Sequence, residues 1–177
     1  MTPTTSPEAS TPRPSQPAAM RLRSSAFLDG AEIPSRHTCK GLNLSPQLEW
    51  SGAPQATEGL LVFVFDPDAG RALGASVPDG FVHWLAFGLT PDVTLLPEGI
   101  PTDRLAGLGG RQARNDFGHP AYQGPCPPAR HRYVFRLIAL DRAIDLPAGV
   151  APGRVLAAVA GHVLAQADLT GVFGPAR

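Results

Sequence analysis

The 177-residue chain lacks the excess charge and the long apolar runs that mark several classes of protein. Lysine and arginine together number 15, as do aspartate and glutamate, so the formal net charge is zero. This balance argues against a nucleic-acid partner and against a basic membrane-surface protein. The longest unbroken apolar run, Leu60 to Phe65, is far too short to span a bilayer. The N-terminus has no apolar segment after a basic start, which predicts no signal peptide and a cytoplasmic location.

Cysteine is scarce, and the spacing of Cys39 and Cys126 fits no CxxC or zinc-finger motif. A disulfide between them stays open, but two buried thiols are the favoured interpretation. A thiol–histidine nucleophile made of Cys126 and His131 is disfavoured, because Cys126 lies between two prolines with no helix N-terminus to stabilise a thiolate. No two histidines have the spacing of zinc ligands, so we expect no metal and no other cofactor.

Glycine and proline are abundant, at 19 and 20 residues, and this predicts many turns and a β-rich architecture. Residues 1–20 are mostly Thr, Ser, Pro and Ala, which predicts a disordered tail before a single domain over residues 21–177. Strands are expected at Leu48–Trp50, at Leu60–Phe65, at Phe81–Leu89 and from His131 onward, with an ordered loop over Thr90–Tyr122. A helix is expected from Pro152 to Gly171. Strands followed by one helix indicate a mainly β or α+β fold.

The stretch Gly124–Asp141 passes from a proline-locked loop into the longest alternating pattern of the chain. One face of this strand carries His131 and Tyr133 ahead of apolar residues. In the strand Phe81–Leu89, alternation places His83 on a face with apolar neighbours, again near a loop. One such histidine is usually a satisfied core residue. Two of them favour a shared pocket whose imidazoles donate hydrogen bonds to a phosphate or carboxylate, with the Tyr133 hydroxyl as a further donor.

Asp66-Pro67-Asp68 follows a strand predicted to be buried on both faces. The carboxylates could orient a histidine, bind a divalent metal, or cap the backbone amides of a turn, and the turn is the commonest role of such a motif. Arg111, Arg114 and Arg132 are expected to be surface charges or to pin loops.

Together, Asp66-Pro67-Asp68-Ala69, His83 and the stretch from Gly124 to Tyr133 resemble the phosphatidylethanolamine-binding protein (PEBP) family, most closely its bacterial Raf-kinase-inhibitor-like branch. Further stretches that carry the resemblance are Asn43-Leu44-Ser45-Pro46, Arg114-Asn115-Asp116-Phe117-Gly118 and Gly161-His162-Val163-Leu164-Ala165. The resemblance covers nearly all of Leu22–Phe173. It implies a large antiparallel sheet packed against a second, smaller sheet, a C-terminal helix, a small anion pocket and, for bacterial members, a homodimer.

Carried over residue by residue, the resemblance implies a ligand-binding pocket made by Asp66, Asp68, His83, Gly124, Cys126, Pro127, Pro128, His131 and Tyr133. Two departures from the family pattern stand out in the sequence. Gly70 replaces a proline, and Ala129-Arg130 replaces a glycine-containing approach to His131.

The leading hypothesis is a non-catalytic protein that binds a phosphate- or carboxylate-bearing small ligand or partner side chain. One alternative is a phosphoester hydrolase in which Asp66 works with His83 or His131. Another is a regulator that docks on a kinase or protease.

Overall fold

The computed structural model describes residues 19–70 and 74–175 of the chain, and these residues form two antiparallel β-sheets with short helical segments. The strands are β1 (Arg21–Arg23), β2 (Leu48–Ser51), β3 (Gly59–Asp66), β4 (Phe81–Leu89), β5 (Leu95–Leu96), β6 (Arg111–Gln112), β7 (His131–Leu140) and β8 (Val163–Phe173). The helical segments are η1 (Ser35–His37), α1 (Thr102–Gly107) and α2 (Pro152–Val159). The predicted mainly β fold, with a larger and a smaller sheet, is confirmed.

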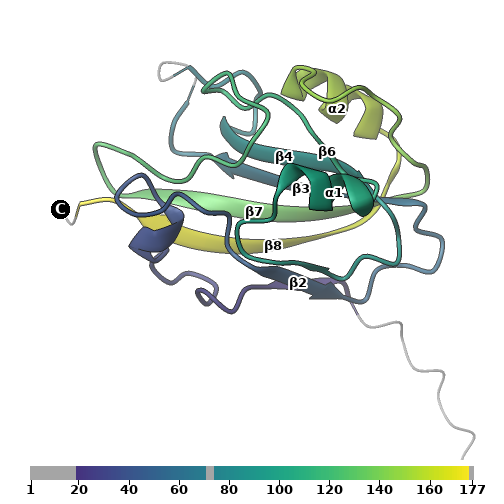
Figure 1. Ribbon diagram of the computed structural model, residues 1–177, viewed down its shortest axis with the longest axis horizontal. Helices are drawn as coiled ribbons and strands as arrows, with labels where there is room; N and C mark the ends of the chain where they lie inside the picture. The colour runs from purple at the N-terminus through teal and green to yellow at the C-terminus, as the bar shows by residue number, and fades with distance from the viewer. Residues whose placement is uncertain (1–18, 71–73, 176–177) are drawn as a thin grey trace, which may run out of the picture.

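The large sheet has the strand order β6-β4-β3-β7-β8, and the small sheet has the order β1-β2-β5. Strand β3 occupies the centre of the large sheet, and all eight of its residues are buried. This is the environment that its continuous apolar sequence predicts. Figure 1 shows the small sheet, marked by β2, on one side of the large sheet and α2 on the other.

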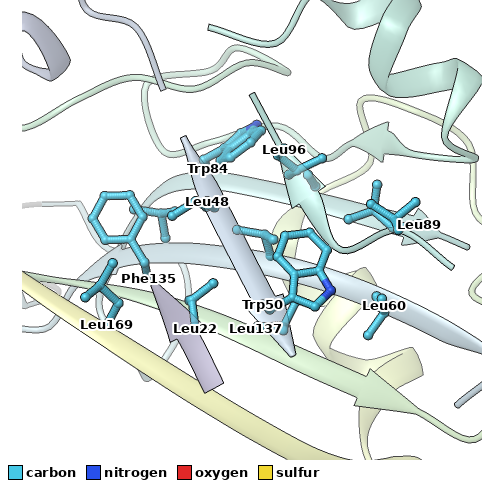
Figure 2. Close-up of a cluster of buried hydrophobic side chains, with 14 of the residues drawn as sticks. Leu22, Leu48, Trp50, Leu60, Trp84, Leu89, Leu96, Phe135, Leu137 and Leu169 are labelled. Carbon is cyan, nitrogen blue, oxygen red and sulfur yellow. The ribbon is translucent and has the colours of Figure 1, made fainter. Parts of the chain in front are cut away.

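The main core lies between the two sheets and contains both tryptophans (Figure 2). Leu22 and Leu48 from the small sheet face Leu60 and Phe135 from the large one. The two indoles differ in one respect. Trp84 Nε1 donates a 2.6 Å hydrogen bond to Gln112 Oε1, whereas Trp50 Nε1 is buried and has no partner among the described residues. Because an unpaired buried donor destabilises a fold, Trp50 is a weak point of this core.

A second core covers the opposite face of the large sheet, where α2 packs through Val155 and Val159. Phe63 and Phe87, from β3 and β4, lie in this cluster. Alternation along β7 serves both cores, because Tyr133, Phe135 and Leu137 belong to the first while Ile138 and Leu140 belong to the second.

The helix predicted from Pro152 to Gly171 is correct only at its start, since α2 ends at Val159. Gly161 follows with φ of 81°, a left-handed conformation typical of the residue after a helix. The chain then becomes β8, which pairs with β7 along its whole length. The small side chains of this segment fit a period of 2 as well as a period of 3.6. Tertiary pairing, which the local pattern does not contain, selects the strand.

Two other predictions are refined by the structure. The ordered loop over Thr90–Tyr122 contains two short strands and α1. The predicted disordered tail lies outside the described residues, except for Ala19 and Met20, and Met20 packs in the main core. None of the helices within the described ranges is long and apolar enough to cross a membrane.

Candidate functional site

A pocket of about 170 Å³ opens at the end of the large sheet where β7 begins and β8 ends. It combines two histidines and one aspartate with an apolar wall. Its lining residues are Asp66, Ala69, Phe81, His83, Phe117, Cys126, Pro127, Pro128, His131 and Tyr133. Seven of the nine predicted site residues are therefore brought together, and no lysine or arginine among the described residues lines this cavity.

Asp66, the last residue of β3, performs two of the roles considered for it. Its Oδ1 accepts hydrogen bonds from the amides of Asp68 (2.8 Å) and Ala69 (3.0 Å), which closes the turn. Its Oδ2 accepts a hydrogen bond from His131 Nδ1 at 2.7 Å. Both partners are almost fully buried, with side-chain exposures of 3% for Asp66 and 12% for His131. The turn thus fixes the carboxylate, and the carboxylate fixes the tautomer and orientation of the imidazole.

Asp68 lies outside the pocket lining and holds the start of β7 in place. It accepts hydrogen bonds from the backbone amide (2.8 Å), Nε (3.1 Å) and Nη2 (2.7 Å) of Arg132. The hydrogen bond from the Arg132 guanidinium lowers the pKa of Asp68, so the pair stays charged at neutral pH. The two aspartates of the turn therefore bind two consecutive residues of β7, His131 and Arg132.

His83 is aimed into the pocket by a β-bulge in β4. Val64 of β3 pairs with Trp84, but the next residue, Phe65, pairs with Val82, which leaves His83 as the extra residue. Bulges of this type re-aim a side chain and are common beside functional sites. The alternation predicted for Phe81–Leu89 is therefore wrong at this point. Val82 packs with Leu85 in the second core, and His83 turns toward Tyr133, with ring centroids 5.2 Å apart.

The bulge is braced by Asn115 and Asp116, two residues that the sequence marks only by their resemblance to the family. Asp116 Oδ2 accepts a hydrogen bond from the Val82 amide at 2.7 Å, and the Asp116 amide donates to the Val82 carbonyl at 3.0 Å. Asn115 Oδ1 accepts from the amides of Phe117 and His119, both at 3.0 Å. These bonds position Phe117, whose ring lies edge-on to Phe81 and His83. Sequence reasoning missed both phenylalanines of the pocket wall.

The pocket rim is the loop of residues 124–130, and Gln123, which precedes it, binds the other side of the His83 ring. His83 Nδ1 lies 2.6 Å from the carbonyl oxygen of Gln123, which accepts only, so Nδ1 carries the proton. Burial lowers the pKa of His83, which favours the neutral ring. Nε2 then has a free lone pair.

Tyr133 completes the polar end of the pocket as a neutral phenol. Burial, and then the negative charge of Asp66, raise the pKa of Tyr133. Its hydroxyl therefore stays protonated over the whole pH range in which the fold can be studied.

The rim is closed by a disulfide between Cys39 and Cys126, which are 87 residues apart in the sequence. The expectation of two buried thiols is wrong on both counts, because the residues are bonded and exposed. Sequence spacing could not show this pairing, since the two loops meet only in the folded chain. The bond also removes the thiol that a Cys126–His131 nucleophile would need.

Gly124, like Asp68, lies outside the lining and supports the rim from behind. Its amide donates to Asn43 Oδ1 at 2.8 Å, and a Cβ at this position would collide with the His37 carbonyl oxygen. No peptide bond of the described residues is cis, including those of the rim prolines. Within those residues, no group of three or more His, Cys, Asp and Glu side chains is placed to hold a metal ion.

The family model for phosphatidylethanolamine-binding proteins matches residues 23–174, a range that contains every residue of the pocket. The chain belongs to this family. A UPF0098 protein of Methanothermobacter thermautotrophicus is 43% identical to this PEBP-family chain over 155 residues, which is 87% of the chain and 98% of the relative. LppC of Mycobacterium tuberculosis, named as a lipoprotein, is 37% identical over 172 residues, 96% of this chain and 79% of LppC.

Two crystal structures have the same fold as this PEBP-family chain. The PEBP homolog CT736 of Chlamydia trachomatis has a TM-score of 0.78 and 34% identity, and the match covers 89% of this chain and 99% of CT736. Escherichia coli YbcL has a TM-score of 0.79 and 30% identity, with coverage of 90% and 100%.

Proposed function

We propose that this PEBP-family chain is a non-catalytic binding protein. Its pocket takes the phosphate or carboxylate group of a small ligand or of a partner's side chain. One observation carries the proposal: the Nδ1 atoms of His83 and His131 are both committed to acceptors of the protein, at 2.6 and 2.7 Å. The Nε2 atoms are therefore available to a ligand. The cavity of about 170 Å³ has the size for one small acidic group.

The hydrogen bonding of the two rings predicts which protonation state of the ligand binds. An uncharged His131 that donates from Nδ1 has only a lone pair at Nε2, so it must gain a proton before it can donate to an anion. Asp66 compensates the resulting positive charge. His83 stays neutral because of its burial, and it accepts a hydrogen bond from a ligand O–H group. We therefore expect a phosphate group that keeps one proton, and an affinity that increases as the pH falls.

Isothermal titration with inorganic phosphate and with O-phosphorylethanolamine, at pH 5.5, 6.5 and 8, tests the proposal. His131→Gln is expected to weaken binding about tenfold or more at pH 5.5, the loss expected for one charge-assisted hydrogen bond. His162→Gln is the matched control, because His162 makes the same kind of contact with Asp141, at 2.8 Å, outside the pocket. An absence of heat at all three pH values, or equal binding by wild type and His131→Gln, would exclude this pocket as the anion site.

Phosphoester hydrolysis is the second candidate, because an aspartate bonded to a histidine also orients a general base. Water would be the nucleophile, because Cys126 is bonded to Cys39 and Tyr133 remains protonated. An assay with p-nitrophenyl phosphate separates the two functions. Turnover by wild type above that of His131→Gln would replace the binding proposal with the catalytic one.

A kinase or protease partner, a homodimer and a cytoplasmic location are further proposals derived from the sequence. A pull-down from the native cell and sedimentation analysis test the first two. For the location, the Cys39–Cys126 disulfide favours an oxidising compartment over the cytoplasm. Fractionation of the native cell decides between the two compartments.

A further inference from the structure

The Cys39–Cys126 disulfide is the covalent attachment of the pocket rim. Cys126, Pro127 and Pro128 line the pocket, so the bond lies in the pocket wall. Cys39 belongs to the loop after η1, a separate part of the chain. The disulfide therefore joins the wall of the site to a loop that provides none of its lining.

Hydrogen bonds hold one half of the rim but not the other. Upstream of Cys126, the Gly124 amide donates to Asn43 Oδ1 at 2.8 Å, and the Cys39 amide donates to the Pro125 carbonyl at 3.1 Å. Over residues 126–130, no backbone hydrogen bond to another described residue is present, and two of these residues are prolines without an N–H group. The only side-chain bond from these residues to the described part of the chain is an exposed 3.3 Å contact between Arg130 and Glu32. Without the disulfide, this half keeps only that exposed contact and the packing of Ala129 and Arg130 against Gly174.

Both cysteines are exposed residues, and exposed disulfides are the ones most readily exchanged with thiolates. His131 follows the rim directly, at the first residue of β7. If residues 126–130 become mobile, the pocket wall and the chain segment that leads into His131 become mobile with them. Ordering these residues again when a ligand binds costs conformational entropy and would reduce the affinity.

We infer that the redox state of Cys39 and Cys126 controls the affinity of the pocket, with the disulfide form as the high-affinity state. A dithiol attacks one sulfur, the S–S bond breaks, and a mixed disulfide forms between reagent and protein. The second thiol of the reagent then displaces the cysteine. Two electrons and two protons pass to Cys39 and Cys126, and the dithiol becomes a cyclic disulfide. The inference rests on the proposed anion binding, because affinity is the property that it regulates.

The test compares phosphate binding at pH 5.5 by the oxidised protein, by the protein reduced with dithiothreitol, and by Cys39→Ser. This variant breaks the bond without changing a pocket-lining residue. We expect affinity to fall about tenfold on reduction and in Cys39→Ser, and to return when the reduced wild type is reoxidised. Amide order parameters from NMR relaxation should fall at Cys126, Ala129 and Arg130 and stay high at Phe135 in the sheet.

The outcomes separate the two proposals. Oxidised protein that binds phosphate no better than reduced protein, with unchanged order parameters in the rim, overturns the redox inference and leaves the binding function in place. Oxidised protein that binds no phosphate overturns the proposed function and the redox control of affinity together. The order parameters then show whether the disulfide orders the rim for another ligand.

Discussion

Replacement of Asp66 by asparagine separates the two roles of this residue. The variant keeps an acceptor oxygen for the amides of Asp68 and Ala69, which are 2.8 and 3.0 Å from Oδ1. It places an NH₂ group toward His131, where wild type has a carboxylate oxygen at 2.7 Å. His131 Nδ1 must then accept rather than donate, so the proton of the neutral ring moves to Nε2.

The magnitudes follow from the number of bonds that each substitution removes. Asp66→Asn exchanges one charge-assisted hydrogen bond, with a value of about 1.5–3 kcal/mol, for a neutral one of about 0.5–1.5 kcal/mol. We expect a loss of about 1–2 kcal/mol in the free energy of unfolding. Asp66→Ala leaves the His131 donor and the two turn amides without their partner in a largely buried region, so its loss should be larger, about 3–5 kcal/mol.

Phosphate binding should change its pH dependence rather than simply weaken. A protonated His131, the form that low pH favours, is paired with a carboxylate in wild type but not in Asp66→Asn, so at pH 5.5 the variant should bind roughly 5–30-fold more weakly, equivalent to about 1–2 kcal/mol. A neutral His131, the form that pH 8 favours, has a lone pair at Nε2 in wild type and an N–H there in the variant. The variant should therefore bind as well as wild type, or better.

Urea unfolding measures the stabilities, and isothermal titration at the two pH values measures the affinities. Asp141→Asn is the matched control, since Asp141 contacts His162 in the same way but in an exposed place beyond the end of β7. Parallel pH profiles for wild type and Asp66→Asn would refute the tautomer argument. Equal stability of the Asn and Ala variants would refute the role of the turn bonds.

Three further predictions concern the fold. Because burial lowers the pKa of His83, the unfolded chain binds an extra proton below about pH 6.5. His83 therefore makes stability fall with falling pH, by at most about 1.4 kcal/mol per pH unit, and His83→Gln should remove this slope in urea unfolding. Trp50→Phe should cost about 1–3 kcal/mol less than Trp84→Phe in the same assay, since only the Trp84 indole has a partner to lose; equal losses would contradict this. Gly171→Ala should destabilise by about 1–3 kcal/mol, because its Cβ would overlap the side chain of Ile33; wild-type stability would show that the core adapts.

The sequence was sufficient for the parts of the fold that local patterns determine. The apolar run before Asp66 predicts the central strand β3, and the alternation after His131 predicts how β7 faces both cores. Pro152 marks the start of α2. It was not sufficient for β8, where small residues fit either period and the pairing with β7 decides.

The candidate site, like the fold, could be predicted where local sequence patterns determine it and could not be predicted where tertiary contacts do. Residue types at strand ends were enough to propose Asp66, His83, His131 and Tyr133 as neighbours, since acids and histidines beside loops are uncommon in apolar strands. The disulfide at Cys126 could not be predicted, because its geometry depends on where two distant loops meet.

The bulge in β4 explains most directly why sequence alone could not complete the pocket. Strict alternation puts His83 on the same face as Leu85, toward the second core, yet the structure packs it against Tyr133. The extra residue of the bulge is held in place by two hydrogen bonds between Val82 and Asp116. Asp116 belongs to a loop more than 30 residues away in the sequence. Asp116→Ala removes the acceptor of the Val82 amide and should therefore disturb His83 without changing a pocket-lining residue. The ¹⁵N chemical shifts of the His83 ring, compared in the two proteins, measure that effect, and unchanged shifts would show that β3 pairing alone holds the bulge.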